Sequence, residues 1–113
     1  MKKFLVLYNA PIASFDEMMK NLTPEKGKEQ SEVWQKWMDD HKDVFIDIGA
    51  PLGKNKRLTS ASLNDARNEV GGYSVVKAES AEDVAKIFSG MPMFGMNGAY
   101  VEIMECMPMS GGQ

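Results

Sequence analysis

The sequence predicts a ferredoxin-like α+β fold, in which a four-stranded antiparallel sheet carries two main helices on one face. Short apolar runs and amphipathic segments follow one another in the order strand, helix, strand, strand, helix, strand. Several of the predicted strands are apolar on both faces, although two helices can cover only one face. With 113 residues, 43% hydrophobic and 26% charged, the chain is expected to form a single domain, residues 1–113.

The first predicted strand covers residues 3–9, "KFLVLYN", and ends before Pro11. Side chains alternate between the two faces of a strand. One face therefore receives Phe4, Val6 and Tyr8, and the other receives Leu5 and Leu7. Because both sets are apolar, we expect this strand to be covered on both sides.

Two helical segments follow. Residues 14–22 predict a short helical turn, with Ser14 as its cap and Glu17 at the capping-box position. A longer amphipathic helix is expected to begin at Thr23, with Pro24 in its first turn. Its side facing the sheet is predicted to consist of Gln30, Val33, Trp34, Trp37, Met38 and His41.

The second strand is predicted at residues 43–52. Alternation places Val44, Ile46 and Ile48 on one face and Phe45 and Asp47 on the other. Residues 53–70 lack clear periodicity and predict an irregular excursion with a short strand near Leu58.

The second half of the chain repeats the strand–helix–strand pattern. Residues 71–78, "GGYSVVKA", predict the third strand, and Ser80 is expected to cap a helix that ends at Gly90. The fourth strand is predicted at residues 99–107. The tail at residues 108–113 is expected to be loose.

An apolar sheet face without helices would be an association surface. The second and fourth strands add Phe45, Tyr100 and Met104 to that face, opposite their aliphatic rows. A second copy packed sheet against sheet is the simplest cover. The sequence therefore predicts a homodimer through the sheet faces.

Composition argues against several classes of protein. The 13 basic and 16 acidic side chains give a net charge of -3, which excludes the basic stripe of a nucleic-acid binder. No apolar stretch approaches the ~18 residues of a membrane helix. The opening run Phe4–Tyr8 is too short for a signal-peptide core, and a single cysteine suits a reducing compartment. We therefore expect a cytoplasmic protein that binds neither nucleic acid nor membranes.

Residues 91–109 contain six methionines and the single cysteine, Cys106. Soft sulfur ligands of this kind select Cu(I). Methionine also fills irregular gaps in protein cores, and Met18, Met19 and Met38 show that the chain is rich in methionine elsewhere. We interpret the stretch as a packing loop and a last strand, and we expect no metal and no cofactor.

Several segments together resemble a known family: "KFLVLY", "IGAPL", "EVGGYSVVKAESAEDVAKIF" and "VEIMEC". The chain is similar along nearly its whole length to the YCII-related proteins, especially their DGPF-type branch, within the dimeric α+β barrel group. This resemblance implies the fold and a dimer. The branch's name tetrapeptide is replaced here by "SASL" at residues 60–63. The helix histidine often proposed as catalytic in the YCII branch is replaced by Glu32, so a histidine-dependent activity does not carry over.

Two carboxylates are candidates for acid–base chemistry. Asp47 and Glu102 each interrupt an otherwise apolar strand on the face turned away from the helices. A carboxylate in such a place often has a raised pKa that suits proton transfer. The alternative is a solvated carboxylate at the rim that pairs with a basic side chain, for which the candidates are Lys56, Arg57 and Arg67.

Other polar side chains complete the candidate site. The residues predicted to line the same space and bind a small organic ligand are Tyr8, Tyr73, Ser74 and Tyr100. His41, at the end of the long helix, is expected to be structural, and Cys106 is expected to behave as a small hydrophobe.

Two classes of function are open at this level. One is a small-molecule-binding or interaction module without assured catalysis, which needs only an apolar shape. The other is a cofactor-independent enzyme that acts on a small aromatic or carbonyl compound by carboxylate acid–base chemistry, which needs a suitably placed carboxylate in a closed pocket.

Overall fold

The computed structural model describes residues 1–108 and confirms the predicted ferredoxin-like α+β fold. Its main sheet has the order β2-β5-β1-β6, and every neighbouring pair is antiparallel. The predicted tail lies almost entirely outside the described residues. The strands of the main sheet are β1 (Lys2–Asn9), β2 (Phe45–Pro51), β5 (Val70–Ala78) and β6 (Tyr100–Glu105).

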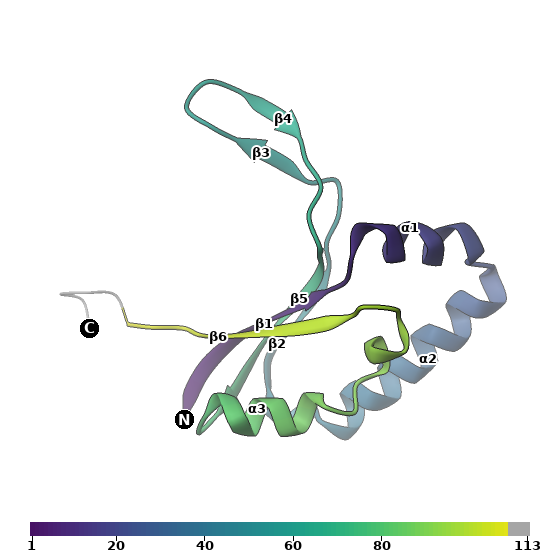
Figure 1. Ribbon diagram of the computed structural model, residues 1–113. Helices are drawn as coiled ribbons and strands as arrows, with labels where there is room; N and C mark the ends of the chain where they lie inside the picture. The colour runs from purple at the N-terminus through teal and green to yellow at the C-terminus, as the bar shows by residue number, and fades with distance from the viewer. Residues whose placement is uncertain (109–113) are drawn as a thin grey trace.

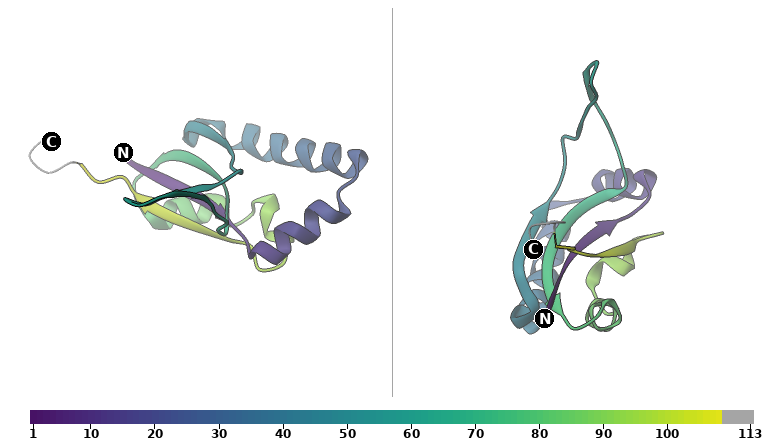
Figure 2. Two further views of the ribbon diagram at one scale, coloured as in Figure 1. Left: turned by 90° about the horizontal axis from the view of Figure 1, so that it is seen from above. Right: turned by 90° about the vertical axis from the view of Figure 1, so that its left-hand side faces the viewer.

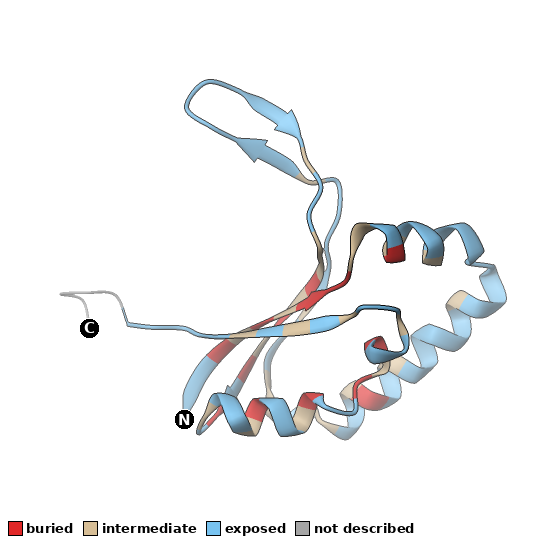
Figure 3. Ribbon diagram, viewed as in Figure 1, coloured by how far each residue is buried: buried red, intermediate tan, exposed pale blue. Residues whose placement is uncertain are grey.

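The helices cover one face of this sheet, as Figures 1 and 2 show. They are α1 (Ile12–Asn21), α2 (Pro24–Asp40) and α3 (Ala81–Phe88), with short 3-10 turns η1 (Lys42–Val44) and η2 (Pro92–Gly95). The buried residues gather between this layer and the sheet (Figure 3). No helix within the described residues is long and apolar enough to span a membrane.

The alternation predicted for the first strand is confirmed. Phe4, Val6 and Tyr8 are buried beneath the helices, whereas Leu5 and Leu7 are half-buried on the other face. The side of the sheet that carries Leu5 and Leu7 is called the helix-free face below. Aromatic rings fill the core on the opposite side, where Trp37 and Phe88 meet edge to face with ring centroids 5.1 Å apart.

The second strand differs from its prediction. Val44 belongs to the turn η1, so the strand begins at Phe45. Phe45 pairs with Val76 and packs against Trp37 in the core, but Asp47 pairs with Val75 on the helix-free face. The register shifts between these two pairs, and this β-bulge places Phe45 and Asp47 on opposite faces.

Helix starts were predicted correctly at two of three places. Thr23 accepts a hydrogen bond from the Lys26 amide at 3.2 Å, and Ser80 accepts one from the Asp83 amide at 3.1 Å. The prediction for Ser14 is wrong, because α1 already begins at Ile12. Ser14 is buried, and its hydroxyl donates to the carbonyl of Asn97 at 2.7 Å.

Residues 53–70 form an ordered β-hairpin instead of an irregular excursion. The predicted short strand near Leu58 is β3 (Lys56–Leu58), and it pairs with the unpredicted β4 (Leu63–Asp65). This β3–β4 hairpin rises from one end of the main sheet and leans away from α1 (Figure 1). The strand β4 escaped prediction because its sequence, LND, is short and mostly polar.

A glycine lies in a second bulge of β2, the register shift between Asp47 and Ala50. Gly49 has φ +83°, and a Cβ atom at this position would lie 1.7 Å from the carbonyl oxygen of Tyr73. The backbones of β2 and β5 therefore approach each other more closely than any side chain at position 49 allows.

We predict that Gly49→Ala lowers the free energy of unfolding by at least ~2 kcal/mol, because it adds strain at positive φ to a backbone clash. Urea denaturation followed by tryptophan fluorescence measures the change. Gly53→Ala is the matched control, because no atom lies within 4 Å of a Cβ there. Equal stability of the two variants would contradict the role assigned to Gly49.

Candidate functional site

The helix-free face carries candidate functional side chains that do not belong to the hydrophobic core. On its central strands, β1 and β5, the side chains are half-buried and mainly apolar: Leu5, Leu7, Tyr73 and Val75. On its edge strands, β2 and β6, they are exposed and more polar: Asp47, Tyr100, Glu102 and Met104.

A hollow of about 310 Å³ lies where this face meets the base of the hairpin. Leu7 contributes to it from the sheet, and the register places Leu7 directly between Tyr73 and Glu102. The remaining lining residues come from the ends of β2 and β5 and the hairpin stem: Leu52, Asn55, Lys56, Asn68 and Val70. The open hollow is therefore lined by both apolar side chains and side chains with amide or charged groups.

Asp47 is held by the same bulge that Gly49 permits. Its Oδ1 accepts the Gly49 amide at 2.8 Å, and its Oδ2 lies 3.4 Å from the hydroxyl of Tyr73, which donates to it. Asp47 therefore fixes the position of the Tyr73 hydroxyl at the edge of the helix-free face.

Tyr100 makes a second tyrosine–carboxylate pair. Its hydroxyl donates to Oε1 of Glu69, which lies just before β5. This hydrogen bond, with smaller contributions from desolvation and from the charges of Glu69 and Glu102, raises the pKa of Tyr100 to about 12. Tyr100 is therefore a neutral hydrogen-bond donor over the physiological pH range.

Glu69 was missed by the sequence analysis because it falls inside the segment that lacked periodicity. A signal was available, since Glu69 stands two residues before the glycine pair that opens the third predicted strand. Its backbone carbonyl also accepts the Ala10 amide at 2.9 Å, which anchors it beside the end of β1.

The two predicted acid–base residues share the helix-free face but lie at opposite edges of the sheet. Asp47 is on β2 and Glu102 is on β6, with β5 and β1 between them. Three strand spacings separate them by roughly 14 Å. Direct transfer of a proton between these carboxylates within one chain is excluded by this distance.

Two of the four predicted ligand-binding residues are in the core, which corrects the expectation that all four line one space. The even-numbered positions of β1 and β5 face the helices, so Tyr8 and Ser74 are buried. The Tyr8 hydroxyl donates to Ser74 Oγ at 2.5 Å, and Ser74 donates to the carbonyl of Ile48 at 2.5 Å. Burial raises the pKa of Tyr8, although the Ser74 hydrogen bond opposes this effect. Tyr73 and Tyr100 remain on the helix-free face.

Two of the three basic partners proposed for a rim carboxylate, Lys56 and Arg67, are engaged elsewhere. Lys56 pairs with Asp65 across the hairpin. Arg67 binds both carboxylate oxygens of Asp16 at 3.2 and 2.7 Å, and this bond lowers the pKa of Asp16. Within residues 1–108, neither Lys56 nor Arg67 neutralises Asp47 or Glu102.

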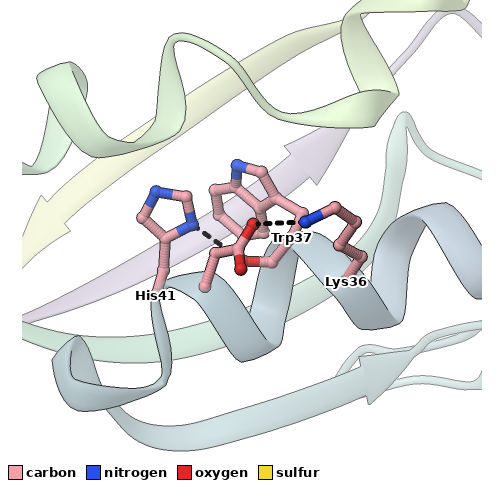
Figure 4. A network of polar contacts seen from close by, with 4 residues as sticks. Lys36, Trp37 and His41 are labelled. Atoms are coloured by element: carbon pink, nitrogen blue, oxygen red, sulfur yellow. Dashed lines mark hydrogen bonds and ion pairs between the residues drawn. The ribbon is translucent and has the colours of Figure 1, made fainter.

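His41 has a structural role at the end of α2 (Figure 4). Its Nδ1 donates to the carbonyl of Trp37 at 2.7 Å, and its ring lies 4.7 Å from the Trp37 ring. Lys36, which Figure 4 also labels, forms an ion pair with Asp40 at 3.3 Å, and both side chains are largely exposed. His41 thus closes the last turn of the helix instead of facing the hollow.

The first part of the methionine-rich stretch packs in the core, as the packing-loop interpretation predicts. Met91 and Met93 are buried in the main hydrophobic cluster, and Met96 packs against it. In the last strand and after it, Met104 and Met107 are exposed. Cys106, which was expected to behave as a small hydrophobe, is also exposed.

A solved structure of similar fold is 5-chloro-2-hydroxyhydroquinone dehydrochlorinase from Burkholderia phenoliruptrix AC1100, in complex with 2,5-dihydroxybenzoquinone. The two chains are 17% identical with a TM-score of 0.50, and the match covers 88% of this chain and 90% of the other. No family model matches the sequence. No curated protein matches it either. The similarity supports the ferredoxin-like α+β fold.

We predict that replacing Glu69 by Gln returns the pKa of Tyr100 from about 12 toward its ordinary value of 10.0, because it removes the carboxylate that holds the phenolic proton. NMR titration of ¹³C-labelled tyrosine measures this pKa. Glu102→Gln should lower it less, and Glu105→Gln should leave it unchanged.

The raised pKa of Tyr100 also makes the stability of the fold depend on pH. Because folding raises this pKa, the contribution of Tyr100 is fully present below pH 10 and is lost as the pH rises through about 12. A Glu69→Gln protein whose Tyr100 still titrates near 12 would contradict the assignment.

Proposed function

We propose that this chain is a YCII-related homodimer of the dimeric α+β barrel type that binds a small planar organic molecule beside Leu7. The observation that supports the proposal best is the hollow on the helix-free face, where apolar side chains of the central strands meet the base of the hairpin. The second copy would close this hollow from the open side.

The exposed surface supports a second copy. The chain exposes 8004 Å², whereas a compact monomer of this length exposes roughly 6,200 Å². Leu5, Leu7 and Val75 contribute half-buried apolar surface on a face without helices, and Met104 is 41% exposed beside them. Sheet-to-sheet packing would remove this surface from water.

Charges on the same face support a two-fold arrangement. At one end, Lys3 and Lys77 are directly opposite each other, and like charges in this position repel. At the other end lie Glu69 and Glu102. A two-fold axis that reverses the ends of the two sheets would set the lysine end of each copy against the acidic end of the other.

The groups around Leu7 favour a ring that carries hydroxyl or carbonyl groups. Leu52 and Val70 offer apolar contact, while Asn55 and Asn68 offer amides that both donate and accept. The structural neighbour was solved with 2,5-dihydroxybenzoquinone, a small planar compound of this kind. That likeness in fold supports the ligand class and does not identify the ligand.

A cofactor-independent enzyme is the second candidate, because of one observation at Glu102. Its exposed carboxylate neighbours Leu7 in the register, and within residues 1–108 no ion pair occupies it. Glu102 could therefore act as a single general base toward a bound aromatic or carbonyl compound. Asp47 would then act by orienting Tyr73 and would not share its proton with Glu102.

We predict that the wild-type chain is a dimer at micromolar concentration and that Leu5→Glu dissociates it without unfolding it, because a charge on the helix-free face opposes sheet packing. Val6→Glu should unfold the chain, because Val6 is completely buried in the core. Sedimentation velocity and circular dichroism separate the two outcomes. A monomeric wild-type chain would refute the proposed dimer.

We further predict that hydroxylated and carbonyl-bearing aromatic compounds shift the NMR signals of Leu7, Tyr73 and Asn68. Leu7→Ala should weaken this binding by removing the floor of the hollow. Val33→Ala is the control and should not change it: the expectation that Val33 faces the sheet was wrong, because its side chain is 54% exposed on α2. If a compound is turned over, Glu102→Gln should abolish turnover while binding is kept. Shifts confined to residues distant from Leu7 would place the ligand elsewhere.

A further inference from the structure

The β3–β4 hairpin presents an apolar surface that its own chain does not cover. Leu58 and Leu63 are directly opposite each other in the ribbon and are 78% and 61% exposed. Neither belongs to the hydrophobic cluster of the described residues or packs against it. Two large aliphatic side chains together at the far end of a projecting ribbon indicate a contact surface.

The ribbon is amphipathic across its two faces. Alternation places Leu58 and Leu63 on the same face as the Lys56–Asp65 ion pair, whereas Arg57 and Asn64 are on the other face. One face is therefore apolar toward the tip and polar only at the stem, and the opposite face is polar. This pattern is typical of a ribbon that packs one of its two faces against another surface.

The hairpin is ordered although its strands have only three residues each. Its turn is closed by the Thr59 amide, which donates to the Ser62 carbonyl at 2.8 Å, and by the Ser62 amide, which donates to Thr59 Oγ1 at 3.1 Å. A two-stranded ribbon is at best marginally stable in water by itself. Local hydrogen bonds therefore preserve its shape, and a packing surface would stabilise it further.

The position of the ribbon indicates which surface this is. The hairpin rises beyond the end of the sheet on the side away from α1 (Figures 1 and 2). Its stem residues Asn55 and Lys56 line the same hollow as Leu7, which belongs to the helix-free face. A second copy seated on the helix-free face would therefore lie next to the ribbon.

The size of the sheet makes a larger contact favourable. Its four strands have six to nine residues each, so they are roughly 20–30 Å long and about 4.8 Å apart, and they cover a planar area of about 500 Å². A stable interface buries about 800 Å² of accessible surface on each partner. The ribbon is an exposed apolar surface next to the sheet face and could extend the sheet-to-sheet contact.

We propose that the β3–β4 hairpin is an arm that packs its Leu58–Leu63 pair on a second copy of this chain. This inference rests on the proposed homodimer and adds a second contact to it. In the dimer, each arm would hold the partner beside the hollow at its own base, so that the hollow is enclosed only when the arm is docked.

The first test compares dimer affinity in two variants by sedimentation equilibrium. The double variant Leu58→Ser/Leu63→Ser should raise the dimer dissociation constant at least about tenfold, because two large apolar side chains lose their contact. Val33→Ser is the matched control: Val33 is 54% exposed on α2, outside the sheet face, and its variant should leave the constant unchanged. Equal dissociation constants for the double variant and the wild type would overturn the proposal.

The second test needs no loss of stability and detects the contact directly. A nitroxide is attached to the cysteine of a Ser60→Cys/Cys106→Ser variant that has natural isotope abundance. This spin-labelled variant is mixed with ¹⁵N-labelled wild type. Amide signals of the ¹⁵N chain should broaden, because the arm of one copy lies on the other. If the wild-type chain dimerises but the amide signals of the ¹⁵N-labelled copy stay sharp, the proposed arm contact is wrong and the sheet-to-sheet dimer is still supported. A wild-type chain that is monomeric would overturn both.

Discussion

The architecture depends on one constraint: β1 is apolar on both faces, and the helices can cover only one of them. Phe4, Val6 and Tyr8 direct one set of side chains into the helix-covered core. Leu5 and Leu7 necessarily point to the other side, at the centre of the sheet. The hollow, the two tyrosine–carboxylate pairs and the proposed dimer contact are all located on that second side.

A buried hydrogen-bond chain connects the two sides. Tyr8 and Ser74 lie under the helices, yet Ser74 donates to the backbone of Ile48 in the bulged strand β2. Because these polar groups are buried, leaving one without its partner would be costly. The chain therefore holds the bulge in place from below, and the bulge in turn places Asp47 beside Tyr73 on the helix-free face.

The sequence was sufficient for the order of elements, the two-sided character of β1 and the caps at Thr23 and Ser80, since each depends on local periodicity or spacing. It was not sufficient for β2, because a bulge changes the face of every later residue and leaves no periodic signal. For that reason Phe45 was assigned to the wrong face.

The candidate site was predictable in part for the same reasons. Alternation located Asp47 and Glu102 on the correct face, but their separation depends on strand order, with two strands between them. Tyr8 and Ser74 were wrongly assigned to the ligand-binding space. Which residues of neighbouring strands share a face depends on how the strands pair, and this register was not used in the prediction. The position of Glu69 before the glycine pair was a weak signal, and its role becomes visible through its tertiary contact with Tyr100.

The bulge at Gly49 also has a consequence for how the chain avoids unwanted assembly. An edge strand with free amides and carbonyls invites pairing with other chains and can seed fibres. In β2, the Asp47 side chain occupies the Gly49 amide, and Pro51 ends the strand without an amide hydrogen. The edge of the sheet at β2 is therefore a poor template for adding a further strand.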